Sequence, residues 1–236
     1  MSANADVLRS SEALGSSMRE TRLPQVVAAG LPHRWNPEVF AREQIRGLVR
    51  RVFLGNVGGP VRQVVFSSAE PHLDIASICD RVAMALAQET RAHVALVDTG
   101  QEIAEGVSTR LASRGTALIK YASAQIAVNL WRVPRSALEG CSEEAGTGLP
   151  WPPCLEELRK EFEYVVIQGP AAGMSGEAAL LGQLTDGIIL VLGAGGTRRA
   201  TARKIKETLA AAQCRILGTV LTERTFPMPE RIYRRL

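Results

Sequence analysis

"VRQVVFSSAEPHLDIASICDRVAMALAQETRAHVALVDTG", residues 61–100, contains two apolar stretches separated by a helical pattern. The outer stretches, Val61–Ser68 and His93–Gly100, are apolar runs typical of strands that are buried on both faces of a parallel sheet. Between them, apolar residues from Ile75 to Leu86 recur at intervals of three and four, which indicates one buried face of a helix. The stretch therefore predicts a strand, a crossover helix and a second, parallel strand.

The same alternation of apolar runs and helical patterns continues along the chain. We expect further strands at 126–134, 164–170, 187–194 and 215–223. We expect helices at 36–55, 154–162, 176–184 and 197–212, and a surface loop at 139–153 that is rich in Gly and Pro. Strands that alternate with helices predict an α/β fold: a three-layer sandwich in which helices flank both faces of a mostly parallel sheet.

Three regions differ in composition. Residues 1–33 are rich in Ser, Ala and charged side chains with little periodicity, which predicts a flexible N-terminal arm. Residues 34–226 carry the alternating pattern and form the predicted α/β domain. Residues 227–236 form a short basic tail.

The composition excludes several classes of site. The four cysteines contain no C-x-x-C pair and the three histidines have no partner at i+4, so we expect reduced thiols and no metal site. No apolar run reaches the ~18 to 20 residues of a membrane span, and the N-terminus lacks the apolar core of a secretory signal. We therefore expect a cytoplasmic protein. The net charge of +4 is compatible with contact to an anionic membrane face or an acidic partner.

The loop after the first strand, "SSAEPHLDIAS" (Ser67–Ser77), decides what the domain can bind. In parallel sheets, ligands bind beyond the carboxyl ends of the strands, so this loop is where a nucleotide-binding protein would hold phosphate. Phosphate loops use glycines to aim backbone N–H groups at the anion and a lysine to neutralise its charge. This loop contains neither glycine nor lysine.

The order of motifs resembles a known family. An E-x-x-R helix, "VALVDTG", "LEELRKEFEYVVIQGP", "LTDGIILVLGAGGTRR" and "ILGTVLTE" follow one another between residues 36 and 226. This order is similar to that of the bacterial tyrosine kinases of capsule and exopolysaccharide export, within the partition and septum-site ATPase class of P-loop proteins. The resemblance implies a P-loop NTPase-like fold, Mg²⁺ and ATP in active members, and a membrane-embedded polysaccharide co-polymerase as partner.

Four loop positions depart from the family pattern S-x-x-P-G-E-G-K-S-T. His72 and Asp74 replace its glycines, Ile75 replaces its lysine, and Ala76 replaces the hydroxyl residue that holds Mg²⁺. Ser77 is retained, but it is not the metal ligand. Asp74 precedes the predicted helix, where its carboxylate can accept free backbone N–H groups. We therefore expect Asp74 to occupy the anion site itself.

Three further positions of the implied nucleotide site lie after other strands. Asp98 is retained from the family's second acidic motif, whereas its companion is a glycine. Gln168 replaces the Walker B aspartate, and an uncharged amide binds a hard cation weakly. Thr222 replaces the asparagine that would read adenine. The site is therefore expected to be vestigial.

These departures favour a non-catalytic function. We expect no catalytic residue, no cofactor and no metal, and a scaffold or regulator in capsule or exopolysaccharide biosynthesis. The alternative is an active ATP-binding tyrosine kinase of the same pathway in which Asp98, Ser77 and Asp74 recruit the metal. A third hypothesis, a DNA-associated partition protein, depends only on the fold and the basic charge, and nucleic acid is not an expected partner.

Two segments are candidate interaction surfaces. Glu43 and Arg46 match the family's E-x-x-R-x-x-R helix, through which subunits form rings, but the third arginine is Arg50, one residue late. A shift of about 100° around the helix moves that side chain off the expected line, so self-association and an ordinary solvated face both stay open. In the tail, the candidates are Arg231, Tyr233, Arg234 and Arg235, which we expect to contact acidic lipid or a membrane protein's cytoplasmic segment.

Overall fold

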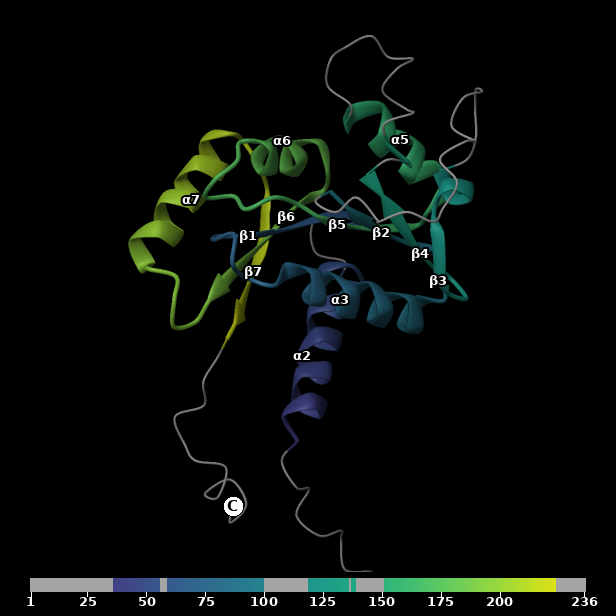
Figure 1. Cartoon of the computed structure of the whole chain (residues 1–236), viewed down its shortest axis with the longest axis horizontal. Coiled ribbons are helices and arrows are strands. Elements are labelled where there is room, and N and C mark those ends of the chain that lie inside the picture. Colours follow the sequence, from purple (N-terminus) through teal and green to yellow (C-terminus); the bar gives the residue numbers. More distant parts are fainter. Residues whose placement is uncertain (1–35, 56–58, 100–118, 136, 139–150, 224–236) are drawn as a thin grey trace, which may run out of the picture. The chain divides into compact units, whose positions relative to one another are not determined.

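Seven strands form one sheet in the order β3-β4-β2-β5-β1-β6-β7 (Figure 1). The computed structural model describes residues 36–55, 59–99, 119–135, 137–138 and 151–223. The strands are β1 (Gln63–Ser68), β2 (Val94–Asp98), β3 (Ala124–Ala127), β4 (Leu130–Pro134), β5 (Tyr164–Gln168), β6 (Gly187–Gly193) and β7 (Ile216–Thr222). All neighbouring pairs are parallel except β3 and β4. The predicted mostly parallel sheet is confirmed.

Helices cover both faces of this sheet. They are α2 (Pro37–Val52), α3 (Ile75–Thr90), α5 (Trp151–Glu161), α6 (Glu177–Leu184) and α7 (Arg199–Ala211), with a short 3₁₀ helix, η2 (Ile119–Ala122). One apolar core joins the sheet to α2 and α3, and a second joins it to α5, α6 and α7 (Figure 1). The three-layer prediction is therefore correct. The arm at 1–33 and the tail at 227–236 lie outside the described residues.

The predicted single strand at 126–134 is wrong, because the chain turns back within it. β3 and β4 form an antiparallel hairpin whose register shifts between Gln125 and Ala127. Asn129 sits at the turn, and its side-chain Nδ2 donates hydrogen bonds of 2.8 Å to the carbonyls of Ala87 and Ala92. These bonds hold the turn against the end of α3, and they depend on contacts that the local sequence does not show.

Helix α5 begins earlier than the sequence predicted. Residues 151–153 were expected to belong to a loop, but α5 starts at Trp151. Pro152 and Pro153 then occupy its first turn, where a backbone N–H needs no helical partner. Trp151 is buried, and its Nε1 donates to Glu177 Oε1 of α6 at 3.0 Å. The apolar and polar contacts of the indole thus fix the helix start.

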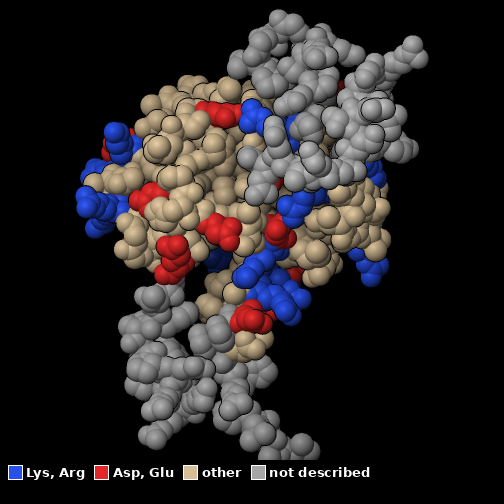
Figure 2. All heavy atoms as spheres, viewed as in Figure 1, with Lys and Arg blue, Asp and Glu red and all other residues tan. Residues whose placement is uncertain are grey.

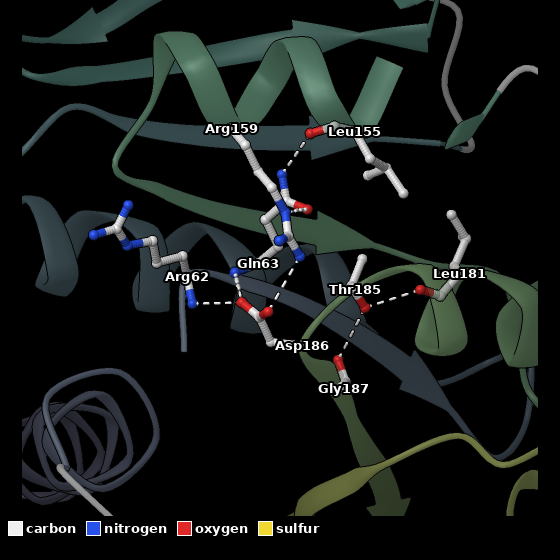
Figure 3. A network of polar contacts seen from close by, with 8 residues as sticks. All are labelled: Arg62, Gln63, Leu155, Arg159, Leu181, Thr185, Asp186 and Gly187. Atoms are coloured by element: carbon white, nitrogen blue, oxygen red, sulfur yellow. Dashed lines mark hydrogen bonds and ion pairs between the residues drawn. The ribbon is translucent and has the colours of Figure 1, made fainter. Parts of the chain in front are cut away.

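A polar network joins β1, α5 and the start of β6 at the amino end of the strands (Figure 3). Asp186 Oδ2 accepts from the backbone N–H groups of Arg62 and Gln63, at 2.6 and 2.7 Å, and its Oδ1 accepts from Arg159 at 3.1 Å. The fully buried Gln63 side chain donates to the Leu155 carbonyl at 2.8 Å and accepts from Arg159 Nε at 2.8 Å. Each buried polar group of Gln63 therefore has a partner, as burial requires.

Candidate functional site

A pocket of about 330 Å³ opens at the carboxyl ends of β1, β2 and β5, at the edge of the sheet where the sequence placed the site. Its volume lies at the lower end of the range of small-molecule sites. The lining residues come from the loops that follow these strands and from the starts of α3 and α6. They are Ser68, Pro71, Leu73, Asp74, Ile75, Ala76, Thr99, Arg135, Gln168, Gly169, Pro170, Ala171 and Glu177.

Three backbone N–H groups of the loop between β1 and α3 have carbonyl partners within the protein. The N–H of Ala69 donates to the Val191 carbonyl at 2.9 Å, and that of Leu73 to the Glu70 carbonyl at 3.3 Å. The N–H of Ile75 donates to the Leu73 carbonyl at 2.9 Å. In a phosphate loop such groups would instead converge on the anion.

Leu73 fixes the path of this loop. Its side chain is only 4% exposed, and a β-carbon added at Gly193 would lie 3.2 Å from Leu73 Cδ2. The loop after β1 is therefore packed directly against the end of β6. Because the leucine is buried there, opening the loop around a bound phosphate would expose apolar surface to water.

Asp74 is the N-cap of α3, as predicted. Its Oδ1 accepts from the Ser77 backbone N–H at 3.0 Å, and its Oδ2 accepts from the Ser77 hydroxyl at 2.6 Å. The hydrogen bonds from the Ser77 hydroxyl and backbone N–H lower the pKa of Asp74 below its usual value. A negative charge thus sits at the helix N-terminus, where a bound phosphate would otherwise receive these donors.

The structure brings four of the eight predicted nucleotide-site residues together. Asp74, Ile75, Ala76 and Gln168 all line the pocket. Ile75, at the position of the family's lysine, is 8% exposed and belongs to the core shared with α3. An apolar side chain at this place offers no charge to a ligand.

The other four predicted residues are not among those that line the pocket. Asp98 is buried at the end of β2, with 4% exposure, whereas Ser77 is exposed and engaged with Asp74. His72 is exposed, with Nε2 3.5 Å from Glu70 Oε2. The Thr222 carbonyl accepts from the Ala194 N–H at 2.9 Å on the far side of β6. The pocket therefore does not unite the full set of positions that the family uses.

Arg135 and Glu177 line the pocket but were missed by the sequence analysis. Arg135 Nη1 donates to the Thr99 carbonyl at 3.0 Å, and the Thr99 hydroxyl donates to the Gln168 carbonyl at 2.7 Å. Arg135 directly follows β4, which is parallel to β2. Recognition of the β3–β4 hairpin would have placed this arginine at the carboxyl edge of the sheet.

The predicted interaction residues of α2 form an ion-pair cluster with α3. Arg46 contacts Glu43 Oε1 at 3.0 Å and approaches Glu89 Oε1 at 3.9 Å, and Arg50 donates two hydrogen bonds of 3.0 Å to the Glu89 carboxylate. The paired Glu89 raises the pKa of Arg50. The shifted arginine thus joins α2 to α3 of the same chain. The tail candidates Arg231, Tyr233, Arg234 and Arg235 lie outside the described residues.

Helix α7 carries a basic surface, visible where Lys and Arg side chains gather at the left of Figure 2. No acidic residue lies in its first turn, and Arg198 provides no side-chain cap. One pair, between Arg203 Nε and Glu207 Oε1 at 3.2 Å, compensates part of this charge. The exposed basic residues are Arg198, Arg199, Arg203, Lys204 and Lys206.

Comparison with known proteins finds similarity to bacterial tyrosine kinases over part of the chain. No family model matches the chain. It is 32% identical over 69 residues to tyrosine-protein kinase CpsD of Streptococcus agalactiae serotype III (strain NEM316). The match covers 29% of this chain, and the chain spans only 30% of the length of that relative. Over these 69 residues the chain is similar to a bacterial tyrosine kinase.

Solved structures agree with the chain on the fold. The chimerical protein CapA2B2 has a TM-score of 0.62 at 19% identity, covering 78% of this chain and 85% of its own. The VpsO kinase domain has a TM-score of 0.61 at 21% identity, covering 80% and 98%. A ParA family ATPase from Chlorobium tepidum TLS has a TM-score of 0.50 at 16% identity, covering 68% of this chain and 73% of its own. The predicted P-loop NTPase-like fold is confirmed.

Within the described ranges, no helix combines the length and apolar character needed to cross a membrane. Among the same residues, no group of three or more His, Cys, Asp or Glu side chains is arranged to hold a metal ion. The pocket itself contains two carboxylate side chains, those of Asp74 and Glu177, each already hydrogen-bonded within the protein.

Proposed function

We propose that this protein is a non-catalytic relative of the bacterial tyrosine kinases, acting as a cytoplasmic scaffold or regulator in capsule or exopolysaccharide biosynthesis. Its partner would be the cytoplasmic face of a membrane polysaccharide co-polymerase or export protein. The similarity to CpsD and the kinase-domain fold support the assignment to this class. The proposed pathway and partner are those of the family that the sequence resembles.

The observation that carries the proposal is the Asp74 cap at the start of α3. Its ionised carboxylate holds the donors of Ser77, and the buried Ile75 stands where a kinase needs a lysine. Phosphoryl transfer is catalysed chiefly by positioning and by neutralising the charge of the transferred group. A site that presents a carboxylate and an apolar side chain at these two positions opposes both requirements.

The basic surface of α7 supports a binding role. Its arginines and lysines are exposed, and cations near a helix N-terminus oppose the helix dipole. That unfavourable placement is relieved when an acidic segment or an anionic membrane face lies against it. A regulator that acts on a membrane-embedded partner would use such a surface to bind at the membrane.

Calorimetric titration with ATP and ADP, with and without Mg²⁺, tests the proposal. We expect no heat and no thermal stabilisation of the unmodified protein at millimolar nucleotide. Micromolar, Mg²⁺-dependent binding would contradict the proposal. The matched variant replaces His72→Gly, Asp74→Gly, Ile75→Lys and Ala76→Ser together, restoring the residue types of a phosphate loop. Nucleotide binding by this variant alone would show that these four residues cause the loss.

One observation favours the alternative, an active ATP-binding tyrosine kinase. The pocket is open, and Arg135 brings a guanidinium to it from β4, so a positive charge is available without a lysine. In that case, Mg²⁺-dependent ATP turnover should be measurable and should be abolished by Arg135→Ala and by Asp98→Asn. Turnover that survives both substitutions would indicate a contaminating activity.

A further inference from the structure

The outer edge of β7 is open in the part of the chain that the structure describes. β7 is the last strand in the sheet order and pairs only with β6. The backbone groups on its other side therefore face no strand among the described residues. Such an edge is a template for pairing with another strand, and proteins usually protect it with charges, proline, bulges or short length.

β7 carries none of the usual side-chain protections. Its sequence, "ILGTVLT" (Ile216–Thr222), contains no charged residue and no proline over seven residues. The pairing of β7 with β6 has one register shift, between Ile216 and Gly218; the five pairs after it are regular, and Leu221 is 61% exposed. The opposite edge strand, β3, has only four residues, so it is the poorer template. The two edges of the sheet thus differ in their capacity to pair.

Opposite charges flank this edge strand. Arg215 precedes β7 and Glu223 follows it; both are exposed, and neither takes part in an ion pair between described residues. When two identical strands pair antiparallel, the start of each lies beside the end of the other. Each Arg215 then lies at the same end of the paired strands as Glu223 of the second copy. The Glu223 carboxylate, which lies beside Gly193 of β6 in the single chain, has to turn outward to meet that arginine.

We propose that two copies of this chain associate through β7, forming an antiparallel pair that continues the sheet from one copy to the other. The interface is isologous, because the same strand contributes from both copies. Backbone hydrogen bonds supply affinity, as in other cases of strand addition. The charges at the strand ends favour antiparallel over parallel pairing, since a parallel pair would place like charges together.

The chain's own C-terminal residues are a less suitable partner for this edge. Pro227 and Pro229 fall within the first six residues after Glu223. A proline has no N–H to donate to a strand ladder, so a hairpin formed directly after β7 would lose two donors in the register that turns these residues toward β7. β7 itself contains no proline, so a second copy of it keeps all its backbone N–H donors.

Sedimentation equilibrium of the full-length chain tests the proposal. We expect a reversible monomer–dimer equilibrium between micromolar and near-millimolar concentrations, with Leu221→Lys weakening the dimer by at least about tenfold because it places a charge at the edge. Val128→Lys is the matched control, because Val128 is 90% exposed at the β3–β4 turn. A monomer at all these concentrations would overturn the proposal.

A charge exchange tests the orientation of the two copies. Arg215→Glu and Glu223→Arg should each weaken the dimer, because each places like charges together at both ends. The double variant should recover much of the lost affinity, since the pairs are restored with their signs reversed. Additive losses in the double variant would contradict antiparallel pairing through β7.

Hydrogen exchange distinguishes a second copy from cover within the same chain. We expect the outward-facing β7 amides to exchange quickly in dilute protein and to become protected as the concentration rises. Protection that is already complete in dilute, monomeric protein would show that another segment of the same chain covers β7, and the proposal would fail.

Discussion

The two ends of the sheet each carry an aspartate that accepts backbone N–H groups, but the two carboxylates connect very different parts of the chain. At the amino end, Asp186 joins the start of β6 to residues 62–63 and to Arg159 of α5. At the carboxyl end, the hydrogen-bond donors to Asp74 belong to Ala76 and Ser77, in the first turn of the helix that it caps. The first contact holds distant segments together, whereas the second shapes a single helix turn.

This difference indicates at which end of the sheet residues can be substituted without loss of the fold. A residue that closes a local turn can be replaced without disturbing the sheet, because its contacts begin and end in one loop. The Asp186 network involves a fully buried glutamine and three separate elements, so each member depends on the others. Substitutions at the carboxyl edge of the sheet can therefore change the pocket while the contacts at the amino edge keep the fold.

The largest expected effect comes from breaking the amino-end network. Asp186→Ala should lower the free energy of unfolding by about 2–3 kcal/mol, because it removes a charged acceptor from two backbone N–H groups and from Arg159. Urea unfolding measures this loss. Glu157→Ala, which removes an exposed pair with Lys160, is the control and should leave the urea midpoint nearly unchanged, because solvent screens this pair. Equal losses of stability in Asp186→Ala and Glu157→Ala would contradict the conclusion that the Asp186 network holds distant segments together.

A smaller effect is expected at the carboxyl end. Asp74→Ala should cost about 1 kcal/mol, the usual loss for a helix N-cap, and Asp74→Asn should cost clearly less because asparagine caps helices equally well. The same urea unfolding experiment applies. A loss at Asp74 as large as that at Asp186 would mean that the loop after β1 supports the whole sheet.

The smallest effect is the pH dependence of the Asp74 contribution. Its pKa is lower in the folded protein than its usual value of 3.8, so the carboxylate's contribution is present above that pH and is lost as the pH falls through the folded pKa. The stability difference between the unmodified protein and Asp74→Asn should therefore shrink below pH 3.8. If the stability difference between the two proteins stays constant until Asp74 is fully protonated, the charge of Asp74 contributes nothing to stability.

Local patterns predicted the features that depend on neighbouring residues. The alternation of strands and helices and the Asp74 cap were predictable because periodicity and capping act within a few residues. The same argument placed the pocket at the carboxyl ends of the strands, since parallel strands end at one edge.

Features that depend on distant contacts were not predictable in this way. The β3–β4 turn is held by Asn129 bonds to α3 and the loop after it, and the start of α5 by the contact of Trp151 with Glu177. Arg135 was missed because the hairpin was read as one strand. The Asp186 network joins side chains that only the folded sheet brings together.

The position of β1 in the sheet has a consequence for synthesis on the ribosome. β1 precedes the other strands of the described residues in the chain, yet its neighbours are β5 and β6: Gln63 lies beside Val165, and Val64 beside Gly187. Its six residues are all buried in the finished domain, so the nascent strand has no partner until most of the chain has emerged. Long-range pairing of this kind slows folding and exposes apolar segments on the way. A nascent chain that stalls before β6 would therefore present β1 to chaperones and proteases, and production of the domain depends on completing its last third.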